Sequence, residues 1–287
     1  MISQRVSEPQ VTLRDTVAFS GIGVHTGILT HVRVMPADAG CGIRFVSAGV
    51  TIPALSEFIV DTRRATMLGA GGVTISTVEH LLCALYGLGI ENATIEVEGP
   101  EIPILDGSAA NFVELFDRVG LRSLDAVRRS FLPGESLVVR DGDGVIVMIP
   151  GDELAVRIAV DHPAPIGSHV FATQVDAASF RVEIAGARTY CSLEDAEKMR
   201  EMGLARGGSL DNALVFGPEG PLTPLRFAAE PARHKALDLL GDLALVGTRV
   251  NAEFVAFKSG HRLHAQLTRL LREQILAAQR RAAPLAS

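Results

Sequence analysis

The chain has 287 residues, 47% of them hydrophobic and 21% charged, which suits one large globular domain or two of ordinary size. Its 27 basic and 33 acidic side chains give a formal net charge of -6, which argues against broad nucleic-acid binding. The N-terminus lacks an apolar signal segment, and no apolar run approaches the ~18 residues that span a bilayer. We therefore expect a cytoplasmic protein with transient membrane-surface contact at most and no obligate protein partner.

The first part of the chain predicts short strands and two helices. Residues 10–19, 30–37 and 42–46 predict strands broken by Gly and Pro, and 93–99 predicts a strand with alternating faces. Helices are predicted over 76–87 and 108–119. A polar stretch with Gly and Pro follows near 125–132, so we predict a domain boundary there, with one domain over 1–128 and the other over 129–287.

The second part predicts the same mixture of elements. Strands are expected at 136–141, 144–150 and 153–162, helices at 192–203 and 232–247, a strand at 254–260 and a closing helix at 261–281. Neither part shows a regular βαβ alternation. The sequence therefore predicts an α+β protein of two domains, each a sheet with packed helices.

The cysteines are widely spaced and form no C-x-x-C pair: Cys41, Cys83 and Cys191. This spacing indicates neither a disulfide framework nor a cysteine metal site. We expect free thiols, buried or half-buried, in a reducing compartment.

A histidine next to a carboxylate lies near the start of the helix predicted over 76–87. Ser76 and Glu79 form an S-x-x-E pattern, which is typical of a capping box and gives Glu79 a structural role. The other interpretation makes Glu79 a general base and His80 a metal ligand at the helix end. The cluster alone leaves both interpretations open.

The helix predicted over 232–247 carries a polar stripe of His234, Asp238 and Asp242. Residues at this spacing advance by about 40° per step and share one face, with leucines on the opposite side. The solvated face of an amphipathic helix is one explanation. Alternatively, His234 and Asp238 bind one metal ion, and two histidines with one aspartate suit catalytic zinc. His80 is then the best candidate for the third ligand.

A further histidine, His261, follows a glycine at the end of a predicted strand, in Lys258-Ser259-Gly260-His261. It is placed to act as a general acid that Asp242 orients, and a surface histidine is the alternative. The other histidines with weaker context are expected to be mostly surface or structural: His31, His162, His169 and His264.

Two segments of the first part contain turn-forming residues. Residues 21–27 are glycine-rich, but the pattern is neither G-x-G-x-x-G nor a P-loop and indicates nucleotide binding only weakly. In residues 101–109, Asp106-Gly107 predicts a turn and Ser108 a cap for the next helix. We interpret this second segment as structural support for the site.

Together these segments resemble the UDP-3-O-acyl-N-acetylglucosamine deacetylases of lipid A biosynthesis. The matching segments lie in the expected order: SGIGVHTG (20–27), STVEHLLCALYGLGI (76–90), PEIPILDGSA (100–109), ARTY (187–190), GGSLDNALV (207–215), RHKALDLLGDL (233–243) and KSGH (258–261). The resemblance implies two α+β domains whose helical layers face each other with a zinc site between them. It also implies hydrolysis of the N-acetyl group of a UDP-linked, acylated amino sugar, with acetate as one product.

The resemblance also implies roles for individual residues. The ligands of the Zn2+ ion would be His80, His234 and Asp238. Glu79 would be the general base, and His261 the general acid with Asp242 as its partner. Thr189 would help to hold the oxyanion, and Lys235 would lie beside the reaction centre.

The substrate would contact a further set of residues, according to the same resemblance. Lys258 and Asp195 would lie towards the sugar-nucleotide. The 3-O-acyl chain would enter an apolar passage formed by an insert at residues 190–210, with these candidate lining residues: Tyr190, Leu193, Met199, Met202 and Leu204. The insert departs from the family pattern at Ser192 and Arg206, which are polar, so the resemblance does not fix the length of the acyl chain.

Two other functions compete with this interpretation. One is another zinc amidase or peptidase, which a peptide substrate would separate from a UDP-sugar deacetylase. The other is a non-catalytic protein that binds a sugar-nucleotide or lipid on the same fold. It predicts neither stoichiometric zinc nor release of acetate.

Overall fold

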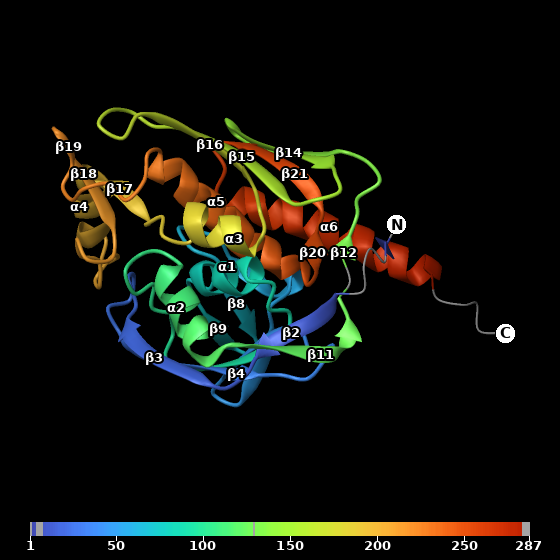
Figure 1. Cartoon of the computed structure of the whole chain (residues 1–287). Coiled ribbons are helices and arrows are strands. Elements are labelled where there is room, and N and C mark those ends of the chain that lie inside the picture. Colours follow the sequence, from blue (N-terminus) through green and yellow to red (C-terminus); the bar gives the residue numbers. More distant parts are fainter. Residues whose placement is uncertain (1, 4–7, 129, 283–287) are drawn as a thin grey trace.

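The computed structural model describes residues 2–3, 8–128 and 130–282, and its main elements stack as a sheet, two layers of helices and a second sheet (Figure 1). This arrangement confirms the prediction of an α+β fold. Within the described residues, no helix is both long enough and apolar enough to cross a membrane. The domain boundary at residue 128 stays a prediction.

The first large sheet has the strand order β3-β4-β10-β5-β6, and its neighbours are antiparallel except for the pair β10 and β5. Its elements and the associated helices are β3 (Val17–Ile22), β4 (Leu29–Pro36), β5 (Ile43–Ser47), β6 (Val50–Pro53), α1 (Glu79–Gly87), β10 (Ala93–Glu98) and α2 (Ala110–Val119). Strand β4 shows the alternation of a half-buried strand, since Thr30, Val32 and Val34 are buried and the residues between them are exposed.

The second large sheet repeats this plan with the order β13-β14-β21-β15-β16 and one parallel pair, β15 and β21. Its elements and helices are β13 (Leu137–Asp141), β14 (Gly144–Pro150), β15 (Ala155–Asp161), β16 (Ser168–Gln174), α5 (Glu230–Leu243), β21 (Ala252–Phe257) and α6 (His261–Ala282). In both sheets a later strand lies between two hairpins, with one helix before that strand and one after it. Helices α1 and α5 therefore occupy equivalent positions and pack against each other between the sheets (Figure 1).

The remaining elements form small sheets and short helices at the edges. One of these sheets begins in the predicted insert and extends beyond it; it contains β17 (Tyr190–Ser192), β18 (Leu214–Gly217) and β19 (Gly220–Pro221), with α4 (Leu193–Glu201) beside it. The others contain β7 (Ile59–Asp61), β8 (Met67–Ala70) and β9 (Val73–Ile75); β2 (Pro9–Leu13) and β11 (Leu121–Val127); and β1 (Ile2–Ser3), β12 (Ser130–Phe131) and β20 (Arg249–Val250). The short helices are Ser56–Phe58, α3 (Ala177–Ser179), Phe180–Ile184 and Ala244–Val246.

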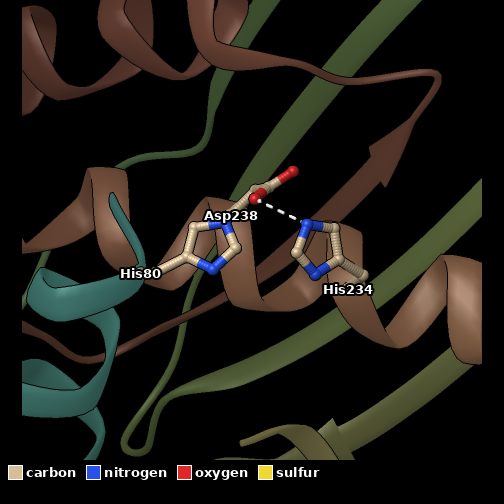
Figure 2. A group of neighbouring side chains, drawn as sticks. All are labelled: His80, His234 and Asp238. Atoms are coloured by element: carbon tan, nitrogen blue, oxygen red, sulfur yellow. Dashed lines mark ion pairs between the residues drawn. The ribbon is translucent and has the colours of Figure 1, made fainter. Parts of the chain in front are cut away.

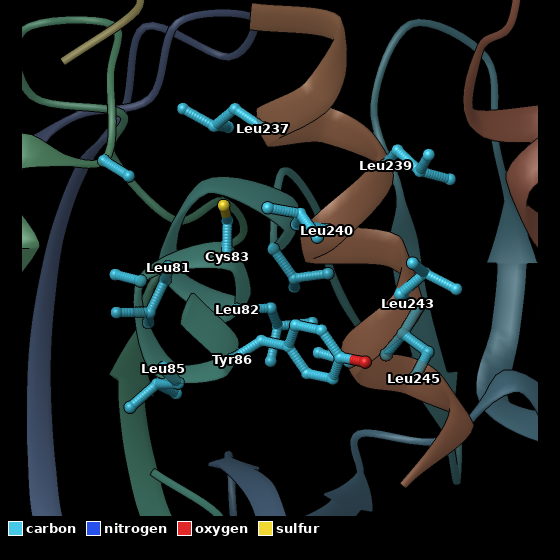
Figure 3. Close-up of a cluster of buried hydrophobic side chains, with 14 of the residues drawn as sticks. Leu81, Leu82, Cys83, Leu85, Tyr86, Leu237, Leu239, Leu240, Leu243 and Leu245 are labelled. Atoms are coloured by element: carbon cyan, nitrogen blue, oxygen red, sulfur yellow. The ribbon is translucent and has the colours of Figure 1, made fainter. Parts of the chain in front are cut away.

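The main hydrophobic core includes the contact between α1 and α5 (Figure 3). Helix α1 is buried on all sides, as expected for a helix that is apolar all round. Its leucines pack against those of α5, and each contributes roughly 1.5–3 kcal/mol through burial: Leu81, Leu82, Leu85, Leu237, Leu240 and Leu243. The helices approach to backbone contact at Gly241, where a Cβ would lie 2.1 Å from the carbonyl oxygen of Glu79.

The capping box predicted at Ser76 and Glu79 is wrong. Ser76 is held in an extended bridge with Glu101, and Thr77 has a φ of +59°, so the helix begins only at Glu79, with Val78 as its N-cap. Glu79 therefore lies inside the helix and is free of the capping role. The turn predicted at Asp106-Gly107 is present. The cap predicted at Ser108 is wrong by one residue, because the N-cap of α2 is Ala109, although the hydroxyl of Ser108 accepts a hydrogen bond from the N–H of Ala110 at 3.2 Å.

Three other expectations also change. The stripe on α5 is not solvated, because His234, Asp238 and Asp242 are only 1–2% exposed and α5 is covered on both sides. Cys41 is exposed rather than buried or half-buried, because it lies in the turn between β4 and β5. The strand predicted over 254–260 ends at Phe257, and residues 258–260 lead directly into α6.

Candidate active site

Three side chains meet where α1 faces α5 (Figure 2). His80 is the second residue of α1, whereas His234 and Asp238 are one turn apart on α5. Their candidate ligand atoms all lie within 4.8 Å of one another, and the residues are 2–3% exposed. The structure therefore gathers two imidazoles and one carboxylate at one buried point.

The backbone orients the ring of His234. Its Nδ1 donates a hydrogen bond to the carbonyl oxygen of Ala187 at 3.0 Å, and its Nε2 lies 3.3 Å from Oδ1 of Asp238. If Nε2 carries no proton, its lone pair faces a carboxylate, which is unfavourable unless a cation lies between them. The donor atoms of this pair therefore fit a metal ion.

His80 supports the same interpretation. Its Nδ1 is buried and has no hydrogen-bond partner among the described residues. Burial, with a smaller contribution from the neighbouring His234, lowers the pKa of His80 to about 3. The ring is therefore neutral, which is the form that binds metals.

Glu79 lies next to this cluster and is 2% exposed. Its Oε2 accepts a hydrogen bond from the N–H of Thr66 at 3.1 Å, and its Oε1 lies 3.6 Å from Nε2 of His261. Burial raises the pKa of Glu79 to about 7, and the nearby carboxylate of Asp242 adds to the effect. A carboxylate with this pKa is suited to accept a proton near neutral pH.

One turn further along α5, Asp242 organises a second cluster. Nδ1 of His261 and Nδ1 of His264 each lie 2.8 Å from its Oδ2, and the hydroxyl of Thr66 donates to its Oδ1 at 2.5 Å. Burial alone would lower the pKa of His261, but the carboxylates of Asp242 and Glu79 raise it to about 10. His261 is therefore protonated at neutral pH, and its Nε2 lies on the side of Glu79.

Lys235 and Thr189 flank these groups. Nζ of Lys235 lies 2.8 Å from Oδ2 of Asp238, which leaves Oδ1 for another partner. The N–H of Thr189 donates to the carbonyl oxygen of Gly107 at 2.7 Å. This hydrogen bond holds the backbone of Thr189 against the turn that precedes α2. Both Lys235 and Thr189 line the cavity described next.

A cavity of about 430 Å³ joins the two clusters to the predicted insert. Its polar lining contains Glu79, His80, His234, Asp238 and His261. Its apolar lining comes largely from the insert: Tyr190, Leu193, Ala196, Met199, Ala205 and Leu210. A single space therefore contacts both charged groups and a surface suited to a hydrocarbon chain.

Some predicted residues lie elsewhere. Of the residues that the structure describes, Leu204 and Asp195 fall outside the lining of this cavity, and Met202, at the end of α4, is 60% exposed. Asp195 lies in the first turn of α4 and accepts a hydrogen bond from the hydroxyl of Ser192 at 2.7 Å. The substrate contacts assigned to Leu204 and Asp195 stay predictions.

Lys258 lies on another side of His261. Its Nζ is 2.9 Å from Oδ2 of Asp161, and it lines a second cavity, of about 390 Å³, together with Arg64, Lys235 and His261. His261 and Lys235 border both cavities. The contact of Lys258 with a sugar-nucleotide also stays a prediction.

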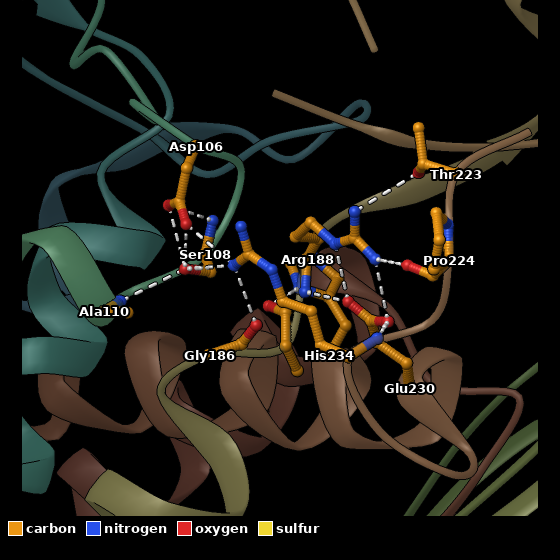
Figure 4. Close-up of polar contacts among 11 residues, drawn as sticks. Asp106, Ser108, Ala110, Gly186, Arg188, Thr223, Pro224, Glu230 and His234 are labelled. Atoms are coloured by element: carbon orange, nitrogen blue, oxygen red, sulfur yellow. Dashed lines mark hydrogen bonds and ion pairs between the residues drawn. The ribbon is translucent and has the colours of Figure 1, made fainter. Parts of the chain in front are cut away.

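A buried ion pair supports the backbone that orients His234 (Figure 4). Arg188 follows Ala187, and its Nε and Nη2 donate to the carboxylate of Glu230 at 2.8 and 3.1 Å. The side chains of Arg188 and Glu230 are only 8% and 0% exposed. Because Glu230 is the first residue of α5, this pair fixes the segment that carries Ala187 and Thr189 to the helix that carries His234.

Sequence reasoning missed the contributions of Thr66, His264 and His25. Thr66 binds both Glu79 and Asp242, but no motif surrounds it. His264 is fully buried in the second cluster rather than at the surface, and its position three residues after His261 is the signal that could have placed both on one helix face. His25 lines the cavity, and its Nδ1 is buried without a hydrogen-bond partner in the described part of the chain.

Comparison with known proteins identifies the family. Residues 10–273 match the family model described as UDP-3-O-acyl N-acetylglycosamine deacetylase. A UDP-3-O-acyl-N-acetylglucosamine deacetylase of Nostoc sp. is 44% identical over 270 residues, which cover 90% of this chain and 96% of the relative. Relatives with the same name from Anaeromyxobacter dehalogenans and Geobacter sp. are 44% and 41% identical, covering 91% and 92% of this chain and 86% and 89% of their own. The chain therefore belongs to the UDP-3-O-acyl N-acetylglycosamine deacetylase family.

Proposed function

We propose that this protein is a zinc-dependent deacetylase of lipid A biosynthesis. It hydrolyses the N-acetyl group of UDP-3-O-(3-hydroxyacyl)-N-acetylglucosamine and gives acetate and UDP-3-O-acyl-glucosamine. The observation that carries this proposal is the meeting of His80, His234 and Asp238 with Glu79 and His261 around one cavity. Membership of the family supplies the class of substrate.

We assign the metal site to His80, His234 and Asp238. When bound there, zinc supplies a Lewis acid that polarises the acetyl carbonyl and lowers the pKa of water towards ~7. The residues are already in suitable forms, because His80 is neutral, Nδ1 of His234 donates to the backbone, and Lys235 contacts only one oxygen of Asp238.

The remaining groups move protons and hold charge. Glu79 takes a proton from the water that attacks the acetyl carbonyl, and its raised pKa suits that role. Thr189 helps to hold the negative oxygen that develops, with Lys235 close by. His261 is protonated and oriented by Asp242, and it donates a proton to the departing sugar nitrogen, which is otherwise a poor leaving group.

The substrate extends from the charged groups in two directions in this proposal. The 3-O-acyl chain enters the apolar lining near Tyr190 and Leu193, with Leu204 further along the insert, and each buried methylene contributes ~0.8 kcal/mol. The nucleotide lies towards Lys258 and Asp195. A substrate without the acyl chain is therefore expected to react far more slowly.

Metal analysis combined with an acetate-release assay tests the proposal. Chelation should abolish release of acetate from the UDP-3-O-acyl substrate, and added zinc should restore it. Full activity of the metal-free protein would rule out the zinc assignment. Binding of the sugar-nucleotide without release of acetate would point to a non-catalytic protein, and faster cleavage of a peptide amide would point to another amidase.

A further inference from the structure

The glycine-rich segment at residues 21–27 binds a carboxylate of the protein itself. The N–H groups of His25 and Thr26 donate to the two oxygens of Glu101 at 3.0 and 2.8 Å, and the hydroxyl of Thr26 donates to one of them at 2.7 Å. Glu101 is fully buried. Successive N–H groups of this kind form an anion-binding concavity. Because Glu101 occupies it, this loop does not cradle a phosphate group.

The other edge of the same loop pairs with the insert of the second half. The N–H of Arg206 donates to the carbonyl oxygen of His25 at 3.3 Å, and the N–H of Gly207 donates to that of Val24 at 3.1 Å. This contact between residues 23–27 and residues 206–207 forms a seam. It joins segments far apart in the sequence through backbone atoms.

The seam is too close for side chains at its glycines. A Cβ on Gly207 would lie 2.4 Å from the carbonyl oxygen of Gly23, and a Cβ on Gly27 would lie 2.9 Å from Cβ of Arg206. A Cβ on Gly107, also in the first half, would lie 2.2 Å from the carbonyl oxygen of Asn212. The insert at the seam, and the segment just after it at Asn212, therefore both pack against earlier parts of the chain at places that require glycine.

The residues at the seam also form part of the cavity wall. Val24 and His25 line the cavity from the loop, and Ala205 and Gly208 line it from the insert. Residues on both sides of the seam are thus neighbours in one wall. Any movement of the seam changes the shape of the space that the apolar lining encloses.

We propose that the loop of residues 21–27 is a specificity-determining element for the acyl chain. Anchored by Glu101, it holds the end of the insert, so that the wall of the passage is continuous and fixed. This inference rests on the proposed function, because it takes the cavity to be the site of the 3-O-acyl chain. Each methylene of a long acyl chain that the wall covers adds to the binding free energy, whereas a sugar-nucleotide without the chain does not contact the wall.

The Gly207→Ala variant tests the seam, because the added methyl group meets the backbone of Gly23 and must displace it. We expect kcat/KM for the acylated UDP-sugar to fall about 15- to 60-fold, the effect of uncovering two or three methylenes. We expect kcat/KM for UDP-N-acetylglucosamine to change less than about threefold, which corresponds to about 0.65 kcal/mol. Gly134→Ala is the matched control, since a Cβ there meets nothing within 4 Å.

A second pair of variants keeps the test valid if Gly207→Ala does not fold. Thr26→Val removes the hydroxyl that binds Glu101 at nearly constant shape, and it should weaken the same preference for acylated substrate. Thr26→Ser keeps the hydroxyl and should restore it. Equal losses on both substrates, or no loss on either, would overturn the inference. A wild-type protein that releases no acetate would instead overturn the proposed function, which separates the two failures.

Discussion

Two groups of three side chains form around Asp238 and Asp242, which are one turn apart on α5, and the hydrogen bonding of the two groups differs. The first group, the ligand cluster, is His80, His234 and Asp238; the second, the acid cluster, is Asp242, His261 and His264. Each brings two imidazoles and one carboxylate within 4.8 Å. Residue type and spacing therefore do not distinguish them.

The two clusters differ in how many polar atoms are already engaged. In the acid cluster both Nδ1 atoms are bonded to Asp242, and Nε2 of His264 lies 3.1 Å from the hydroxyl of Ser259. In the ligand cluster, Nε2 of His234 faces a carboxylate, and Nδ1 of His80 has no partner among the described residues. A cation fits where donors are missing, and a proton-transfer group fits where a carboxylate holds Nδ1 of the imidazole and leaves its Nε2 towards the cavity.

The largest expected effect separates the clusters by metal content. His234→Ala removes one of three ligands, so we expect loss of bound zinc and a fall in kcat of about 10³-fold or more, since a metal ion contributes several kcal/mol to such reactions. His264→Ala, in the acid cluster, should retain zinc at one equivalent. Elemental analysis after dialysis measures both. Zinc lost from His264→Ala and kept by His234→Ala would reverse the assignment.

The next effect concerns proton transfer with the metal retained. Glu79→Ala and His261→Ala should each lower kcat/KM by about 10²–10⁴-fold, the usual contribution of general acid–base catalysis. The double variant should lose less than the product of the single losses, because both groups act on one transition state. Asp242→Ala should resemble a milder His261→Ala. If zinc-loaded His261→Ala kept a near-full kcat, another group would have to be the general acid, with His264 as the first alternative.

The ion pair behind the ligand cluster predicts an effect on stability. Arg188→Ala leaves the buried carboxylate of Glu230 unpaired and should lower the free energy of unfolding by about 3–5 kcal/mol in urea denaturation. Arg33→Ala breaks an exposed pair with Glu96 and is the control, with a loss below about 1 kcal/mol. A loss no larger than that of Arg33→Ala would contradict the supporting role of the Arg188 pair.

The same ion pair has a definite dependence on pH. Burial alone would raise the pKa of Glu230, but the hydrogen bonds from Arg188 lower it. The pair therefore stabilises the folded state above the pKa of an unfolded glutamate, and this contribution is lost as pH falls through the lower, folded value. The difference between wild type and Arg188→Ala should shrink in acid, and a constant difference would contradict this origin.

The smallest effect is the shape of the pH profile, about tenfold per unit on each limb. Glu79 acts when deprotonated, so kcat/KM should rise with pH up to its raised pKa of about 7. His261 acts when protonated, so kcat/KM should fall above its raised pKa of about 10. The apparent values belong to the coupled pair. An alkaline limb that persists in His261→Ala would assign that limb to another group.

The sequence was sufficient for the features that depend on local spacing. The stripe on α5 placed His234, Asp238 and Asp242 on one face, and the Gly260-His261 sequence identified the residue that begins α6. Most strands of the two large sheets also follow from alternation and from glycine and proline breaks. Strands β6 and β16 were not predicted, and the single strand predicted over 10–19 is divided between β2 and β3. The S-x-x-E pattern failed because Ser76 is paired with a distant segment at Glu101, and a local motif contains no information about that pairing.

Long-range contacts account for the rest. Thr66 reaches Glu79 and Asp242 only because its loop lies across the α1–α5 contact, and its neighbours in sequence show no pattern. Both faces of α5 are buried because α1 packs against it. The pattern of apolar and polar residues within α5 alone gives no information about that contact. The role of the glycines in residues 21–27 could not be predicted from the local sequence, because their partner, Gly207, lies in another part of the chain.

The backbone contact at Gly241 determines how the site tolerates change in the core. Since the carbonyl of Glu79 would lie 2.1 Å from a Cβ at position 241, the spacing between the proton acceptor and the ligands on α5 is set by two main chains. Substitutions among the leucines around this crossing, for instance Leu240→Met, are then expected to change the melting temperature without changing the spacing between Glu79 and the ligands on α5. Laboratory evolution for thermal stability is thus expected to accept many substitutions among those leucines and almost none at Gly241, where even a methyl group would move Glu79 away from the ligands on α5.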